Sequence, residues 1–182
     1  MKQPPVLGFA AYSGTGKTTL ISKVIPLLQA GGMRVAVIKH AHHTFEIDHP
    51  GKDSYELRKA GAAQMLVASR NRWALVVDEE QDEDPRLDQL IPRLDTDSID
   101  LILVEGFKHS SIPKIEIYRQ SCRRPLQCLK DASIVAVAAD SEQPSNVVIP
   151  WLDLNKPEQA AAFILNEFVV DNALKLAANL PG

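Results

Sequence analysis

Short apolar runs alternate along the chain with segments in which apolar residues recur every three or four positions. Continuous apolar runs are typical of buried strands, and the second spacing is typical of amphipathic helices. Seven strands are predicted: Val6–Ala11, Val35–Ile38, Gln64–Ala68, Trp73–Val77, Leu101–Val104, Ile115–Tyr118 and Ile134–Ala138. Three helices are predicted: one that contains Leu20–Leu28 and stops at Gly31, one at Asp53–Ala60, and one from about Pro157 into the 170s.

This alternation predicts an α/β fold with a mostly parallel sheet, in one domain over residues 1–182. The tetrapeptide Ser69–Arg72 lies between two adjacent predicted strands and favours a β-hairpin there. Pro26 lies inside the first predicted helix and is expected to kink it. Of the polar segments, Asp78–Asp84 is predicted to be a solvated loop and Arg119–Lys130 a mobile one.

Composition narrows the class of protein. The 182 residues are 45% apolar and 24% charged, which fits one soluble domain, and the net charge of −3 gives no reason to expect a nucleic-acid partner. No apolar run approaches the roughly 20 residues that span a bilayer, so no membrane partner is expected. Cys122 and Cys128 fit neither a Cys-x-x-Cys site nor a disulfide framework, so the expected compartment is the cytoplasm.

A phosphate-binding loop is predicted between the first strand and the first helix. Residues 11–18 read AYSGTGKT against the pattern G-x-x-x-x-G-K-[ST], with Ala11 in place of the first glycine. In such a loop the backbone N–H groups point at the phosphates, Lys17 neutralises phosphate oxygens and the Thr18 hydroxyl ligates Mg²⁺. The alternative is a turn of small residues that happens to precede a helix. The loop and the element pattern together predict a P-loop NTPase-like three-layer sandwich with a β-hairpin extension.

A second acidic group is expected beside this loop. Glu105 follows the apolar strand Leu101–Val104 and emerges at its carboxyl end, where α/β sheets bind ligands. It is predicted to hold Mg²⁺ together with Thr18. The alternative is an ordinary surface glutamate.

Four of the five histidines follow the second predicted strand within ten residues: His40, His42, His43 and His49. Imidazole and carboxylate groups suit Zn, Ni or Cu, so one interpretation is a transition-metal site. A second is a loop that contacts the phosphates or a partner, and a third is a solvated polar loop. Contact with phosphate or substrate is favoured, because the second strand ends beside the phosphate loop in such folds.

Two segments are candidates for recognition of a guanine base. Asn155-Lys156-Pro157-Glu158 is close to an N-K-x-D element, but Asn155 and Glu158 are also spaced as a helix capping box, and capping is favoured. Asp140 follows the predicted strand Ile134–Ala138 and is the better candidate to pair with guanine.

Six segments carry a resemblance to a known family: FAAYSGTGKTTL, VIKHAHH, HPGKDSYELRKAGAAQ, RWALV, DLILVEGFKH and VAVAAD. They are similar to the molybdopterin-guanine dinucleotide biosynthesis protein B family, usually called MobB. The segments spread over residues 9–140, and the element from His49 to Gln64 is more specific than the phosphate loop. Alanine at position 11 is ordinary in that family.

The resemblance implies a homodimeric GTP-binding accessory protein with weak GTPase activity in molybdenum cofactor biosynthesis, and GTP and Mg²⁺ are the expected cofactors. Its implied partners are the molybdenum cofactor guanylyltransferase and molybdopterin-handling proteins. The implied phosphate loop is Ser13, Gly14, Thr15, Gly16, Lys17, Thr18 and Thr19, with Glu105 as the second acid. His40, His42, His43, Asp53 and Arg58 would line the same cleft.

Two other functions stay open from the sequence. A small-molecule kinase also pairs a phosphate loop with a carboxylate, and Arg119, Arg123 and Arg124 could then form its lid. A metallochaperone GTPase would use the histidine cluster at residues 40–43.

Overall fold

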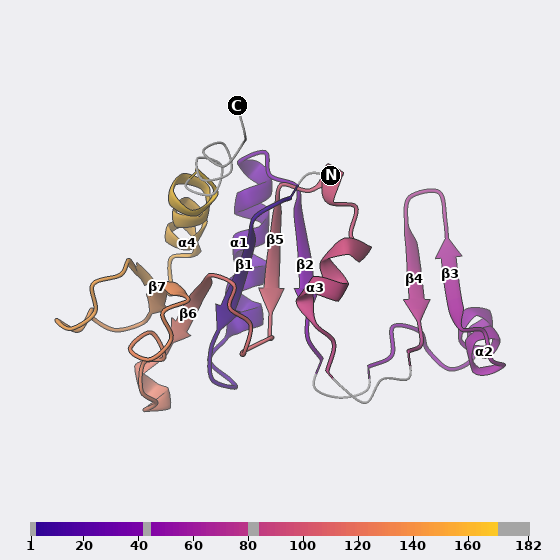
Figure 1. The fold of residues 1–182 in the computed structure, drawn as a ribbon, viewed down its shortest axis with the longest axis horizontal. Helices are drawn as coiled ribbons and strands as arrows, with labels where there is room; N and C mark the ends of the chain where they lie inside the picture. Colours follow the sequence, from indigo (N-terminus) through magenta and orange to yellow (C-terminus); the bar gives the residue numbers. More distant parts are fainter. Residues whose placement is uncertain (1–2, 42–44, 80–83, 171–182) are drawn as a thin grey trace. The chain divides into compact units, whose positions relative to one another are not determined.

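The computed structural model describes residues 3–41, 45–79 and 84–170. The chain forms two compact units (Figure 1). The core unit comprises Met1–His40 and Leu87–Gly182, and the insert unit comprises Ala41–Arg86. The prediction of one domain over residues 1–182 stays a prediction. Among the described residues, no helix is both long enough and apolar enough to cross a membrane.

A six-stranded parallel sheet forms the centre of the core unit, in the order β2-β5-β1-β6-β7-β8. The strands are β1 (Val6–Ala10), β2 (Val35–Lys39), β5 (Leu101–Glu105), β6 (Lys114–Tyr118), β7 (Ile134–Ala139) and β8 (Trp151–Asp153). β1 lies between β5 and β6, with Phe9 opposite both Glu105 and Ile115. The carboxyl ends of these three central strands therefore lie at the same edge of the sheet, which confirms the predicted α/β class.

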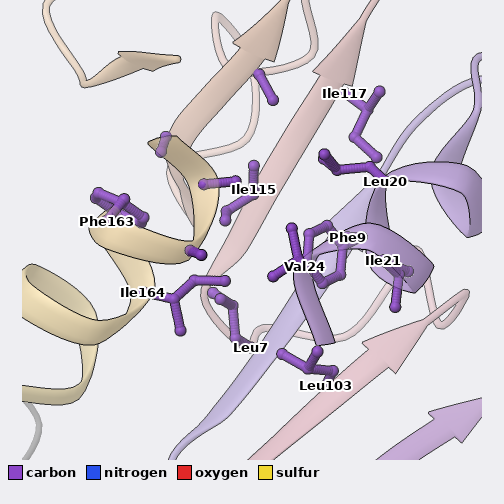
Figure 2. Close-up of a cluster of buried hydrophobic side chains, with 14 of the residues drawn as sticks. Leu7, Phe9, Leu20, Ile21, Val24, Leu103, Ile115, Ile117, Phe163 and Ile164 are labelled. Atoms are coloured by element: carbon purple, nitrogen blue, oxygen red, sulfur yellow. The ribbon is translucent and has the colours of Figure 1, made fainter. Parts of the chain in front are cut away.

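One face of the sheet is covered by α1 (Lys17–Ala30) and α4 (Pro157–Phe163), the latter continued by a π-helical segment, Ile164–Val169. Side chains alternate between the two faces of a strand, so Leu7 and Phe9 both enter this layer. Figure 2 shows the labelled side chains of the strands and both helices packed together. Burial of these apolar groups is the main force that holds α1, and with it the loop before α1, against the sheet.

The opposite face has thinner cover. Ile102 and Val104 of β5 pack with Leu87 in α3 (Leu87–Leu90), which runs into a 3₁₀ turn at Ile91–Arg93. Next to it, side chains of β7 pack with residues from two irregular segments, among them Leu126 and Ile149. The sheet is thus the middle of three layers, as predicted, although loops supply much of the third.

The insert unit contains α2 (Asp53–Lys59) and an antiparallel hairpin of β3 (Gln64–Ala68) and β4 (Trp73–Val77). The predicted hairpin turn is confirmed: the backbone N–H of Ser69 donates to the carbonyl of Arg72 over 2.7 Å. Arg58 is 9% exposed and pairs with the carboxylates of Glu46 and Asp78. These ion pairs tie α2 to the segments on either side of it.

Several expectations need correction. α1 runs from Lys17 to Ala30 with Pro26 inside it, and the kink expected at Pro26 stays a prediction. β8 and α3 were not predicted, because each is too short to show a periodic pattern. The capping box at Asn155 is wrong: the N-cap is Lys156 with no side-chain cap, and the Asn155 N–H donates to Asp153 instead.

Candidate nucleotide-binding site

The loop between β1 and α1 has the backbone of an anion-binding turn. Gly16 is the N-cap residue of α1 and has φ +97°, a left-handed conformation that suits glycine. The Thr15 side chain is 1% exposed and donates to the carbonyl of Tyr12 over 2.9 Å, so it closes the loop from within. Ser13, Gly14, Thr18 and Thr19 are exposed. Ala11 is buried at the end of β1, so its methyl group does not obstruct the loop.

Lys17 folds its ammonium group back over this loop. Its Nζ donates to the carbonyls of Ala11 over 3.2 Å and Tyr12 over 3.4 Å. Burial lowers the pKa of Lys17, and the nearby carboxylate of Glu105 opposes that shift. Lysine thus places a positive charge beside the N-terminus of a 14-residue helix, and both favour an anion.

Thr18 and Glu105, the two predicted Mg²⁺ ligands, lie in direct contact. The Thr18 hydroxyl donates to Oε1 of Glu105 over 2.8 Å, and Lys39 Nζ lies 3.4 Å from Oε2. The side chain of Glu105 is only 13% exposed, although it is at the strand end. One hydroxyl and one carboxylate suit Mg²⁺, which is usually held by one or two carboxylates with phosphate and water oxygens.

The backbone turns sharply after Glu105, against His40. Gly106 has φ +99°, and a Cβ there would lie 2.7 Å from the Cβ of His40. Phe107 also has a positive φ, +50°, and its ring lies 4.9 Å from the imidazole of His40 between centroids. The N–H of His40 donates to the Glu105 carbonyl over 2.8 Å. His40 therefore supports the chain that carries Glu105, a contact that sequence reasoning did not identify.

On the other side of the loop, Arg119 follows β6 directly and reaches two groups. Its Nε donates to the carbonyl of Thr15 over 2.9 Å, and its Nη1 lies 3.3 Å from Oδ2 of Asp140. Oδ1 of Asp140 accepts from the backbone N–H of Gln120 over 2.9 Å. Both carboxylate oxygens of Asp140, the residue predicted to pair with guanine, thus already have partners within the chain. The sequence signal for Arg119 was its place directly after a predicted strand in a sheet of this class.

A cavity of about 580 Å³ opens at the carboxyl ends of β7 and β8. Its lining is rich in hydrogen-bond acceptors, including Asp140, Glu142, Asp153, Asn155 and Gln159. Trp151 also lines it and donates its indole N–H to the carbonyl of Ser141 over 2.8 Å. Both sequence candidates for base recognition, Asp140 and Asn155, therefore border one cavity.

The segment Arg119–Lys130 is anchored at several points, which does not fit the expected mobile loop. Glu116, fully buried in β6, accepts the backbone N–H groups of Gln127 and Cys128, each over 2.8 Å. Burial raises the pKa of Glu116. The guanidinium of Arg124 lies over the Tyr12 ring, 5.6 Å from its centroid. A segment held by these contacts is not free to close over a substrate, which argues against the kinase lid suggested for Arg119, Arg123 and Arg124.

The four remaining predicted residues fall within the sequence range of the insert unit, residues 41–86. Asp53 and Arg58 belong to the insert unit. Asp53 is the first residue of α2, and Arg58 forms the ion pairs described above. Their contact with nucleotide stays a prediction. His42 and His43 lie outside the described residues. Within residues 3–41, 45–79 and 84–170, no group of three or more metal-ligating side chains is assembled.

Known proteins resemble this chain over most of its length. Residues 6–140 match the family model described as molybdopterin guanine dinucleotide synthesis protein B. The chain belongs to this family, MobB. A molybdopterin-guanine dinucleotide biosynthesis adapter protein from Escherichia coli K12 is 51% identical over 162 residues, which is 88% of this chain and 91% of that protein. One from Haemophilus influenzae is 43% identical over 90% of this chain and 89% of that protein.

Solved structures of the family share the fold. A crystal structure of molybdopterin-guanine biosynthesis protein B superposes with a TM-score of 0.72 at 27% identity, covering 91% of this chain and 99% of that one. A MobB homologue from Bacillus stearothermophilus gives a TM-score of 0.68, covering 91% of this chain and 98% of that one. The MobB fold predicted from six sequence segments is thereby confirmed.

Proposed function

We propose that this MobB protein is a GTP-binding adapter of molybdopterin guanine dinucleotide biosynthesis. Its E. coli and H. influenzae relatives are named as adapters of that pathway. The observation that carries the nucleotide proposal is the contact of Thr18 with Glu105, next to Lys17 and the N-terminus of α1. A hydroxyl and an ammonium group from the first turn of α1 converge there with a carboxylate from the end of β5.

In this proposal the triphosphate lies along residues 13–19. The backbone N–H groups and Lys17 bind phosphate oxygens, while Thr18 and Glu105 hold Mg²⁺. The base would enter the cavity at the ends of β7 and β8, whose carboxylates match the N–H donors on the Watson–Crick edge of guanine. Acceptors favour guanine over adenine there, since adenine presents an acceptor at N1.

Hydrolysis is proposed to be slow. Lys17 would stabilise charge that develops on the γ-phosphate oxygens during in-line attack of water, and bound Mg²⁺ would neutralise the rest. Fast P-loop GTPases add a water-orienting glutamine and an arginine finger, and the sequence identifies neither. The protein therefore fits an adapter that holds GTP beside a guanylyltransferase and molybdopterin-handling proteins better than a fast enzyme.

We also propose a homodimer, in which the insert hairpin contributes to the contact. Leu66 lies opposite Leu75 in the register, and Trp73 is two residues from Leu75, so all three side chains share one face of the hairpin. They are 57%, 46% and 67% exposed. A two-stranded hairpin with an exposed apolar face is marginal alone and gains from a partner surface. A second copy of the chain supplies such a surface.

Titration calorimetry with GTP and ATP, each with Mg²⁺ and with EDTA, tests the nucleotide proposal. GTP should bind more tightly than ATP, and Mg²⁺ should strengthen GTP binding. A preference for ATP would contradict the proposal. The adapter role is tested by adding the protein to a guanylyltransferase reaction, where it should increase formation of molybdopterin guanine dinucleotide.

A further inference from the structure

One arginine connects the phosphate loop to the rim of the cavity. Arg119 donates to the Thr15 carbonyl through Nε over 2.9 Å and approaches Asp140 through Nη1 at 3.3 Å. The two partners lie 125 residues apart in the chain, one before α1 and one after β7. A planar guanidinium can hold both at once because its N–H groups point in fixed, different directions.

Pinning the Thr15 carbonyl has a consequence for the loop. In a trans peptide the C=O and N–H bonds point in opposite directions, so the Thr15 oxygen sets where the N–H of Gly16 points. Gly16 is the N-cap of α1 and has φ +97°. Because glycine adopts φ of either sign, it leaves the orientation of the preceding peptide plane freer than another residue would. The bond from Arg119 removes that freedom.

Asp140 in turn fixes Arg119. Its Oδ2 faces the guanidinium, and its Oδ1 accepts the N–H of Gln120, the residue next to Arg119. The pair is partly shielded, since the Arg119 and Asp140 side chains are 34% and 21% exposed. Both carboxylate oxygens of Asp140 are therefore committed to residues 119 and 120.

We propose that Arg119 is a positioning residue that aims the Gly16 N–H at a bound phosphate, and that Asp140 acts through Arg119. This inference rests on the proposed nucleotide site and adds the device that holds its loop in the binding geometry. It gives Asp140 a role in phosphate binding, in contrast to the base contact predicted from sequence.

The test measures affinity for GTP and for inorganic tripolyphosphate, which has no base, by titration calorimetry with Mg²⁺. The variants are Arg119→Ala, Arg119→Lys, Asp140→Asn and Arg119→Ala with Asp140→Asn. Arg123→Ala is the matched control, because it removes the same charge four residues away. Thermal melting without ligand checks the fold, and Arg119→Lys carries the test if Arg119→Ala does not fold.

Arg119→Ala and Arg119→Lys should each weaken both ligands about tenfold, the loss expected for one charge-assisted hydrogen bond. Lysine should not rescue, because it cannot reach both partners. Asp140→Asn should weaken both ligands, and the double variant should be no weaker than Arg119→Ala. Arg123→Ala should bind as the wild type does.

If the wild type binds GTP and this binding depends on Lys17, the proposed nucleotide site stands. Three results would then overturn only the inference about Arg119. They are full affinity in Arg119→Lys, a loss in Asp140→Asn confined to GTP, and losses that multiply in the double variant. The second of these would show that Asp140 reads the base. Wild-type protein that binds neither ligand would overturn the proposed nucleotide site as well.

Discussion

The hydroxyl of Thr18 donates a 2.8 Å hydrogen bond to the carboxylate of Glu105, 87 residues further along the chain. The parallel pairing of β1 with β5 brings them together, because Glu105 is the last residue of β5 and Thr18 lies in the first turn of α1, which follows the same end of β1. Each supplies an oxygen of the kind that Mg²⁺ prefers. The hydrogen bond therefore holds in place the two groups that we propose as Mg²⁺ ligands.

Glu105→Gln should remove most of the gain that Mg²⁺ brings to GTP binding. The amide oxygen can still accept the hydrogen bond from Thr18. It lacks the negative charge that attracts both Mg²⁺ and the ammonium group of Lys39. We expect about a tenfold weaker affinity in Mg²⁺ and little change in EDTA, measured by calorimetry. Asp100→Asn, just before the opposite end of β5, is the control and should bind normally. Equal loss in EDTA would show a general disturbance of the site.

Gly106→Ala should destabilise the core unit more than Gly32→Ala. Both glycines have positive φ, +99° and +85°, so both substitutions cost backbone strain of about 1 kcal/mol or more. A Cβ at Gly106 would also meet the Cβ of His40 at 2.7 Å, whereas one at Gly32 has nothing within 4 Å. The free energies of unfolding of the two variants in urea should separate the backbone strain, which both share, from the steric clash with His40. Equal losses would mean that His40 moves aside freely.

Cys128 should be a slow nucleophile at neutral pH. Burial raises the pKa of its thiol to about 11, and the nearby carboxylate of Glu116 adds to the shift. Since a higher pKa leaves less thiolate, alkylation of Cys128 by iodoacetamide in a Cys122→Ser background should rise steeply only above about pH 10. Mass spectrometry of the labelled peptide measures this. Rapid labelling at pH 7 would contradict the buried setting.

Trp73→Asp should weaken the proposed homodimer. The charge would enter the apolar face that Trp73 shares with Leu66 and Leu75. Sedimentation velocity should show a shift toward monomer at micromolar concentration. Val148→Asp is the control, because Val148 is 93% exposed in the core unit and should leave the dimer intact. A dimer that tolerates Trp73→Asp would remove the hairpin from the contact.

Sequence pattern predicted β1, β5 and β7 well because these strands are largely buried on both faces. The apolar runs at residues 6–10, 101–104 and 134–138 all became parallel strands at the predicted places. The three-residue strand β8 could not be predicted, since its pairing with β7 decides it rather than any periodic pattern. The capping box predicted at Asn155 failed for a similar reason. The carboxylate of Asp153 accepts the backbone N–H of Asn155 that the capping box would have paired with Glu158.

The site was predictable where motif spacing fixes it and not where tertiary contacts do. Lys17, Thr18 and Glu105 converge as the phosphate-loop pattern and the strand end indicated. The bond of Arg119 to the Thr15 carbonyl and the contact of Gly106 with His40 depend on how separate strand ends meet. The place of Arg119 after a predicted strand marks the residue, but no local pattern identifies its partner or the partner of Gly106.

The affinity of Lys17→Ala for GTP with Mg²⁺ tests the phosphate loop most directly. Loss of an ammonium group that we propose to bind several phosphate oxygens should weaken binding about a hundredfold in calorimetry. Lys23→Ala, an exposed lysine on α1, is the control and should bind as the wild type does. Unchanged affinity in Lys17→Ala would contradict the nucleotide site.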